Sequence, residues 1–194
     1  MNIKDIIKGL QGFSLPLLTR QEMIKSKINR NLYLTALGFS SCVNQYLTKG
    51  KVSPQQYMLI YCVEGLGFID LGNSKYEQSQ DEFIIFPEGI SHLFFTSFTD
   101  PWRIYWVGFN GELADDLYKR GSSNSGVMAC KVSYDENRLT VFNRIYRVLS
   151  QSYTSDDLEL ANFQLTYFIT SLIYDNGIKS SSSDEDPINA SVIL

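Results

Sequence analysis

Histidine is almost absent from this sequence, since His92 is the only one among 194 residues. Nucleophilic catalysis needs a base beside the nucleophile, and protein zinc sites usually draw on several histidine or cysteine side chains. The neighbouring hydroxyl of Ser91 would point to the opposite face of an extended strand. The composition therefore gives no support for a catalytic site or a transition-metal site.

Cysteine is also scarce. The three cysteines, Cys42, Cys62 and Cys130, are an odd number without CxxC spacing, which predicts reduced thiols in a cytoplasmic chain rather than a disulfide framework. The sequence has no run of about 18 apolar residues and no secretory signal pattern at its start. We therefore expect a soluble, cytoplasmic protein of one domain, or of one domain with an appendage.

A basic excess is missing as well, because 17 Lys and Arg stand against 21 Asp and Glu and leave a net charge of −4. Contacts with phosphates supply much of the affinity of proteins for DNA, so this chain is not expected to hold DNA alone. Aromatic residues, in contrast, are plentiful, with 12 Tyr and 12 Phe. They are compatible with a thick β core and equally with a pocket walled by rings.

Segments rich in β-branched and aromatic residues begin at Tyr33 and alternate with turn formers about every 8–12 residues. A hairpin signal, Gly72-Asn73, separates two of the shorter segments. The pattern predicts a β-barrel or sandwich. The predicted strands cover residues 33–41, 57–64, 67–71, 74–78, 82–86, 92–96 and 102–109.

Helical periodicity replaces this pattern after Gly111. We predict helices at 112–120 and 135–152, and a third that starts after the cap region 155–157 and closes at Asn176-Gly177. A linker rich in serine and acidic residues follows. The predicted regions are an N-terminal arm (1–30), a barrel (31–133), a helical region (134–177), and a linker with the truncated start of a further domain (178–194).

The most specific local pattern is P-x-G-x-x-H, from Pro87 to His92, directly after the hydrophobic strand at 82–86. It resembles the second half-motif of the cupins, small double-sheet jelly-roll barrels whose metal-binding members add two further His and a Glu. This chain offers only Asp70 and Glu77 in the preceding hairpin. We therefore expect a cupin barrel with C-terminal helices and without metal or other cofactor, in which His92 faces the interior or caps a turn.

Four patterns in the right order resemble the sensor domains of AraC-family transcription regulators. Residues 57–67 are similar to Y-x-L-x-Y-x-x-x-G-x-G, and residues 81–87 to the family's G-D-x-x-x-x-P strand, with Gln80 in place of glycine. His92 follows, and residues 101–111 match x-W-x-x-x-W-x-x-F-x-G. The resemblance spans roughly residues 33–177. It implies a homodimeric, non-enzymatic domain that binds a small molecule, commonly a sugar, and controls DNA binding by a C-terminal helix-turn-helix domain absent here. By the same resemblance, the helical region 134–177 is the dimerisation region, and residues 178–194 are a linker with the truncated start of the missing DNA-binding domain.

The resemblance also implies where a ligand would lie. On the strand at 102–109, Trp102, Ile104, Trp106 and Gly108 share one face. The second Trp of the family strand stacks on the sugar, and an indole suits the C–H face of a pyranose, so Trp106 is the leading candidate. A role as a core residue is the alternative for this side chain.

Further ligand-binding candidates come from neighbouring strands. His92 and Phe94 share a face, although Phe94 could equally be a plain core residue. Ser40 falls near a family hydroxyl position, and Lys51 flanks the position of a family arginine. Ile104 replaces the histidine of the arabinose sensor, which puts arabinose itself in doubt and leaves a less polar pocket.

The last predicted helix supplies the candidates for dimerisation. Some belong to its main apolar stripe, which could instead pack on the barrel, and others lie off that stripe and suit a self-complementary seam. The dimerisation candidates are Leu158, Leu160, Leu165, Tyr167, Phe168 and Leu172. A cupin-fold enzyme, such as an isomerase or dioxygenase, and a stand-alone carbohydrate-binding module stay open as alternatives, which metal content and the length of the parent gene would separate.

Overall fold

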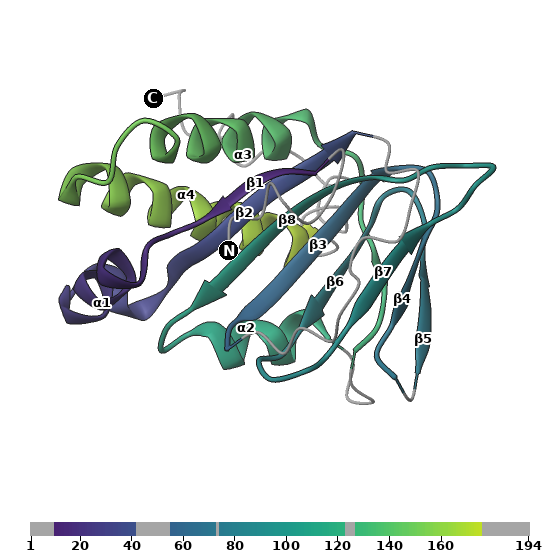
Figure 1. The fold of residues 1–194 in the computed structure, drawn as a ribbon, viewed down its shortest axis with the longest axis horizontal. Coiled ribbons are helices and arrows are strands. Elements are labelled where there is room, and N and C mark those ends of the chain that lie inside the picture. The colour runs from purple at the N-terminus through teal and green to yellow at the C-terminus, as the bar shows by residue number, and fades with distance from the viewer. Residues whose placement is uncertain (1–9, 42–54, 73, 123–126, 176–194) are drawn as a thin grey trace, which may run out of the picture.

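The computed structural model describes residues 10–41, 55–72, 74–122 and 127–175, which form two antiparallel sheets and a set of helices (Figure 1). The strands are β1 (Leu10–Ser14), β2 (Tyr33–Ser41), β3 (Tyr57–Glu64), β4 (Gly67–Asp70), β5 (Lys75–Gln78), β6 (Glu82–Phe86), β7 (Leu93–Thr96), β8 (Arg103–Asn110) and β9 (Cys130–Lys131). The helices are α1 (Leu17–Lys25), the 3₁₀ turn η2 (Asn29–Asn31), α2 (Ala114–Gly121), α3 (Glu136–Leu149) and α4 (Ser155–Ile173).

The strand order identifies the architecture. The large sheet runs β1-β2-β8-β3-β6-β9, and the small sheet runs β5-β4-β7. Strand β8 thus lies between β2 and β3 in the large sheet. Between β3 and β8 along the chain, β4, β5 and β7 belong to the small sheet and β6 to the large one, an alternation typical of a double-sheet jelly roll. The predicted cupin-like fold, mainly β with C-terminal helices, is confirmed, and seven strands and three helices lie within a few residues of their predicted bounds.

Residues 10–30, which belong to the predicted N-terminal arm, form a strand, a helix and the start of a 3₁₀ turn. Strand β1 extends the large sheet by pairing with β2, with Gly12 opposite Gly38. Helix α1 follows Pro16, and of its side chains only Met23 is buried. With Leu17 and Leu18 exposed, α1 has no continuous apolar stripe, which is the signal that would have predicted it.

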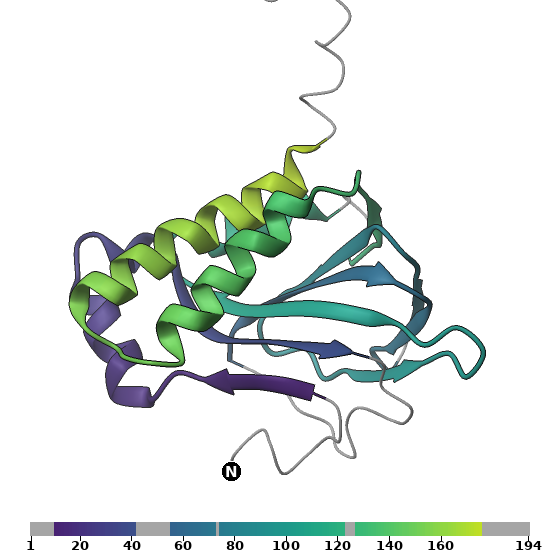
Figure 2. The ribbon, with the colours of Figure 1, turned by 90° about the horizontal axis from the view of Figure 1, so that it is seen from above.

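The large sheet is buried on both of its faces. Strand side chains alternate in direction, so each strand contributes to a core cluster on either side of the sheet. On β8, Tyr105, Val107 and Phe109 point toward the helices and join their core cluster, while Ile104 and Trp106 belong to the cluster between the two sheets. Figure 2 shows α3 and α4 side by side across the outer face of this sheet. The ring centroid of Tyr105 lies 4.9 Å from that of Phe142 on α3.

Helix α4 begins one residue after its cap. The backbone N–H of Asp157 donates to the Thr154 hydroxyl at 3.3 Å, so the N-cap is Thr154 rather than a residue of the expected region 155–157. Asp156 and Asp157 then lie in the first turn, where a negative charge favours the helix macrodipole. The carboxylate of Asp157 also accepts hydrogen bonds from Ser152 and Thr154.

A buried arginine ties the C-terminal end of α4 to the start of α3. Arg138 is 1% exposed, and its guanidinium donates to the Asp175 carboxylate at 2.7 Å and to the Ser171 carbonyl at 2.9 Å. It also donates to the Ser133 carbonyl. The second carboxylate oxygen of Asp175 accepts the Ser133 backbone N–H at 2.7 Å, so one ion pair fixes three segments of the chain.

Replacing Asp175 tests this anchor. We expect Asp175→Ala to lower the free energy of unfolding by about 3–5 kcal/mol, because it leaves the buried Arg138 charge unpaired. Denaturant unfolding followed by circular dichroism measures the change. As a matched control, Asp115→Ala removes the exposed partner of Lys119 and should have no measurable effect; equal losses in the two variants would contradict the assignment.

Candidate ligand-binding site

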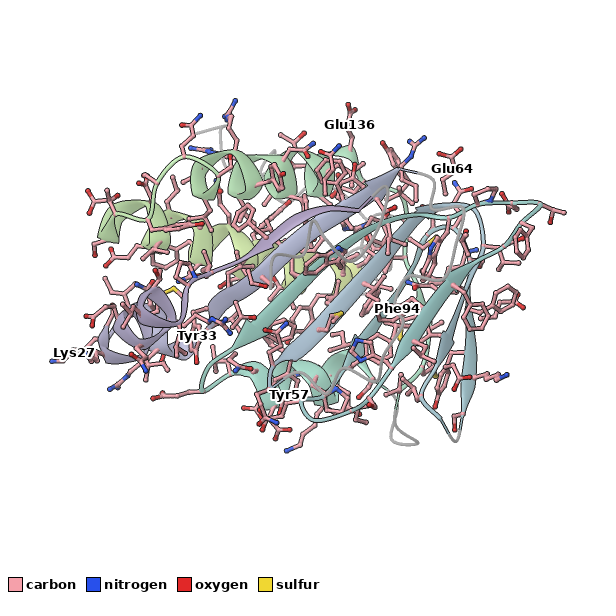
Figure 3. The ribbon with its side chains drawn as sticks, viewed as in Figure 1. Lys27, Tyr33, Tyr57, Glu64, Phe94 and Glu136 are labelled. Atoms are coloured by element: carbon pink, nitrogen blue, oxygen red, sulfur yellow. The ribbon has the colours of Figure 1, made fainter. Side chains whose placement is uncertain are left out.

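The interior between the two sheets is lined mainly by apolar side chains, as shown by its buried cluster of Ala36, Ile60, Cys62, Ile69, Ile84, Phe86, Phe94, Trp102, Ile104 and Trp106. Among the described residues, the only buried Lys, Arg, Asp or Glu is Arg138, which lies on the helical side of the large sheet. Figure 3 labels Phe94 on β7, whose ring centroid lies 6.4 Å from that of Trp102. This wall suits an uncharged molecule better than an ion.

The orientation of Trp106 is set by two glycines that face each other on β1 and β2. A Cβ atom built on Gly38 would lie 2.6 Å from the Trp106 ring, and one built on Gly12 would lie 2.9 Å from it. The six-membered ring of the indole therefore rests on bare backbone, where any larger residue would displace it. Gly12 lies in the region predicted to be an arm, and only the β1–β2 pairing reveals its role.

Trp106 and Ser40 present polar atoms without partners. The side chains of Trp106 and Ser40 are 8% and 0% exposed. Neither the indole N–H nor the serine hydroxyl has a hydrogen-bond partner within the described part of the chain. A buried donor or acceptor left unpaired costs about 1–3 kcal/mol. The two residues lie on the same face of paired strands, with Gly38 opposite Trp106 and Ser40 opposite Ile104, so a polar ligand could satisfy both.

His92 lies just before β7, stacked on aromatic rings. Its ring centroid is 4.7 Å from that of Phe94 and 5.6 Å from that of Phe86. Its Nδ1 lies 3.0 Å from the Ile90 carbonyl oxygen, which can only accept, so Nδ1 carries the hydrogen and Nε2 offers a lone pair. Burial lowers the pKa of His92. A neutral imidazole of this kind can accept a hydrogen bond but adds no positive charge.

The other described candidates also lie in the interior, where Trp102 makes several structural contacts. Trp102 is fully buried and fills the space left by Gly67, while its backbone N–H donates to the Thr96 hydroxyl at 2.8 Å. Ile104 is buried in the same cluster. The structure thus brings Trp102, Ile104, Trp106, Phe94 and Ser40 to the interior. Lys51 lies outside the described residues.

The dimerisation candidates separate into two sets on α4. Leu158, Leu165, Phe168 and Leu172 are buried in this chain's own core against α3 and the large sheet. For these four residues the structure favours the alternative, in which the main apolar stripe packs on the barrel, because side chains buried there are not free to meet a second copy. Leu160 and Tyr167 are 38% and 44% exposed. Phe163, which was not predicted, is also exposed, at 64%.

The buried thiol of Cys62 is poorly suited to act as a nucleophile. Burial raises the pKa of the Cys62 thiol to about 12, which keeps this sulfur protonated and unreactive near neutral pH. Among the described residues, no group of three or more His, Cys, Asp or Glu side chains could hold a metal ion. In the same part of the chain, no helix is long and apolar enough to cross a membrane.

Comparisons with known proteins give a consistent family. Residues 36–163 match the family described as the AraC-like ligand binding domain. The MmsAB operon regulatory protein of Pseudomonas aeruginosa is 23% identical over 104 residues, or 52% of this chain, and the Msm operon regulatory protein of Streptococcus mutans is 23% identical over 94 residues, or 48%. Each match covers 34% of the relative, so the chain spans about a third of the length of these proteins.

Solved structures of similar shape are more distant. ToxT from Vibrio cholerae O395 is 14% identical with a TM-score of 0.41, and the match covers 87% of this chain and 58% of ToxT. YhaK from Escherichia coli is 11% identical with a TM-score of 0.46, and the match covers 65% of this chain and 52% of YhaK.

The pKa of His92 predicts a pH dependence of stability. Because folding lowers this pKa, the unfolded state takes up a proton more readily than the folded state. The contribution of the neutral ring to the free energy of unfolding is therefore lost as the pH falls below the ordinary histidine pKa of about 6.5. We expect the free energy of unfolding of the wild type to fall, relative to His92→Gln, between pH 7 and pH 5, by at most about 1.4 kcal/mol per pH unit. Urea unfolding at a series of pH values measures both slopes, and parallel slopes would show that the ring is not buried as a neutral group.

Proposed function

The chain belongs to the AraC-like ligand binding domain family, and from this premise we propose that it is the effector-sensing and dimerisation domain of an AraC-type transcription regulator. Its effector would be a neutral small molecule, a sugar or a sugar derivative, bound between the two sheets. DNA binding would belong to a helix-turn-helix domain outside this chain, in keeping with the net charge of −4. The observation that carries the proposal is the unpartnered indole N–H of Trp106, in an interior where the described residues include no buried Lys, Arg, Asp or Glu.

A saccharide suits this interior for two reasons. The C–H face of a pyranose packs on a flat indole, and Trp106 offers both the ring plane and a hydrogen-bond donor. Ser40 supplies a hydroxyl that can donate or accept, and His92 supplies an acceptor at Nε2. The apolar walls favour a derivative with some apolar surface over a fully hydroxylated sugar.

The same interior favours sensing over catalysis. A general base must reach the proton that it removes, and His92 is held by the Ile90 carbonyl among phenylalanine rings. The Cys62 sulfur donates to backbone carbonyls and stays protonated. Both side chains are held by backbone carbonyls rather than by each other, which supports ligand binding over bond cleavage.

Dimerisation would use the exposed face of α4. Leu160, Phe163 and Tyr167 follow at helical spacing and form one apolar strip on the outside of the helix. Phe163 also borders a groove of about 210 Å³ that includes Ile28 and Leu113. A two-fold contact buries the same strip on both copies, which gives these side chains an apolar environment.

A thermal-shift screen tests the effector proposal. Neutral monosaccharides, methyl glycosides and disaccharides are compared with sugar phosphates and uronic acids. We expect at least one neutral compound to raise the melting temperature, because a ligand present at 100 times its Kd adds about 2.7 kcal/mol to the native state. Charged analogues should give little or no shift.

Two variants make the screen specific. Trp106→Phe should abolish most of the shift, since it removes the indole N–H and part of the stacking surface. Phe98→Ala alters an aromatic side chain that is 87% exposed and should leave the shift unchanged. A metal-dependent activity, or a shift from the charged compounds alone, would count against a neutral-ligand sensor.

The oligomeric state tests the dimer proposal separately. We expect the wild type to be dimeric in light scattering or sedimentation, and Phe163→Asp to weaken the dimer at least tenfold, because it places a charge in the apolar strip. Leu18→Asp makes the same change on α1 at a side chain that is 75% exposed and should have no effect. A monomeric wild type, or equal effects of both variants, would refute the assignment.

A further inference from the structure

Strand β2 carries a β-bulge directly beside the candidate site. In its pairing with β8, Leu34 lies opposite Phe109 and Ala36 lies opposite Gly108, so Thr35 is an extra residue without a partner position. A bulge turns a side chain away from the direction that strict alternation would give it. Strand alternation, which predicts the other interior residues, therefore does not predict the direction of the Thr35 side chain.

The bulge turns the Thr35 hydroxyl toward the interior. Gly108 shares a face with Trp106, and a Cβ atom built on Gly108 would lie 2.8 Å from the Thr35 Oγ1 and in contact with the Gln56 side-chain amide. Thr35 is 1% exposed, and its hydroxyl has no hydrogen-bond partner in the described part of the chain. The absent side chain of Gly108 leaves these two polar groups next to bare backbone.

One side chain from α4 holds the bulge in place. The Leu34 backbone N–H donates to the Asn162 Oδ1 at 2.9 Å. The Asn162 Nδ2 donates to the Asn29 Oδ1 at 2.9 Å and to the Met23 sulfur at 3.4 Å. Asn162 is 5% exposed, so its amide joins β2, α1 and η2 from within the core.

We propose that Thr35 is a further ligand-contacting residue, and that Asn162 is the positioning residue that presents it. The proposal rests on the sensor function above and adds a hydroxyl contact on the far side of Trp106 from Ser40. Gly108 is two residues from Trp106 on β8, which corresponds to about 7 Å along the strand. A ring stacked on the indole thus brings its substituents toward the Thr35 hydroxyl, which donates to or accepts from a ligand oxygen.

The geometry also connects the site to the helices. A ligand bonded to Thr35 stabilises the bulge, and the bulge is bonded through Leu34 to Asn162 on α4. The backbone carbonyl of Thr35 accepts the Leu15 N–H at 2.8 Å, just before α1. The bond from Leu34 to Asn162 and the bond from Leu15 to Thr35 therefore couple ligand binding in the interior to α4 and to the α1–η2 segment.

The first test needs no ligand. Thr35→Val replaces an unbonded buried hydroxyl with a methyl group of the same shape, so the melting temperature should stay the same or rise. Thr96→Val is the matched control, because the Thr96 hydroxyl accepts the Trp102 backbone N–H at 2.8 Å, and its loss should lower the melting temperature. An equal fall in both variants would show that the Thr35 hydroxyl is already bonded and would overturn the proposal.

The second test uses the neutral saccharides of the screen, titrated calorimetrically. Thr35→Val should weaken the binding of those that shift the wild type by roughly tenfold, the value of one hydrogen bond. Unchanged affinity would overturn the Thr35 contact and leave the sensor proposal standing. If no saccharide shifts the wild type, the saccharide proposal fails, and the melting temperatures still decide whether the hydroxyl is free.

The positioning role of Asn162 has its own comparison. Asn162→Ala releases the bulge, so it should lower both the melting temperature and the saccharide affinity. Asn29→Ala removes a neighbour in the same network that does not touch the bulge, so it should lower the melting temperature and leave the affinity within about twofold of the wild type. Equal losses of affinity in the two variants would reduce Asn162 to a general stabiliser of the fold.

Discussion

The rest of the structure depends on one constraint, which is that the large sheet is buried on both faces. The outward side chains of β8 pack on α3 and α4, and the inward ones face the small sheet. Each aromatic or large aliphatic side chain buried in the helical layer contributes roughly 1.5–3 kcal/mol. The helical layer therefore supplies much of the core, and the opposite face can keep polar atoms unpaired, as it does at Trp106 and Ser40. The helical layer on the outer face of the sheet thus stabilises the site, and contacts inside the site do not have to.

Polarity follows the same division. The only buried arginine or acidic side chain among the described residues is Arg138, and each of its three guanidinium nitrogens donates a hydrogen bond on the helical side. Between the sheets the polar groups include hydroxyls, the indole N–H groups of Trp102 and Trp106, and a neutral imidazole. A charge needs a paired counter-charge when it is buried, so the interior fits a neutral, partly apolar effector. Family membership and this division of polarity are independent lines of support for a sensor.

Much of the fold could be predicted from the sequence because strand alternation and helical periodicity are local signals. The alternation on the strand at 102–109 placed Trp106 and Ile104 on one face, as the structure confirms. What could not be predicted depends on partners far along the chain. Gly12 matters only because β1 pairs with β2 and Trp106 lies above it, and Thr35 lies in a bulge whose neighbouring Leu34 N–H is bonded to Asn162, more than a hundred residues later. A bulge breaks the period on which such predictions rely.

The most direct test of the central claim is the indole N–H spectrum of the protein labelled with ¹⁵N-tryptophan. The chain has two tryptophans, and Trp106→Phe assigns their two signals. With a pool of neutral saccharides at saturating concentration, the Trp106 signal should move because its N–H gains a partner, and it should move further than the signal of the fully buried Trp102. A fixed Trp106 signal under conditions in which a saccharide raises the melting temperature would contradict the account.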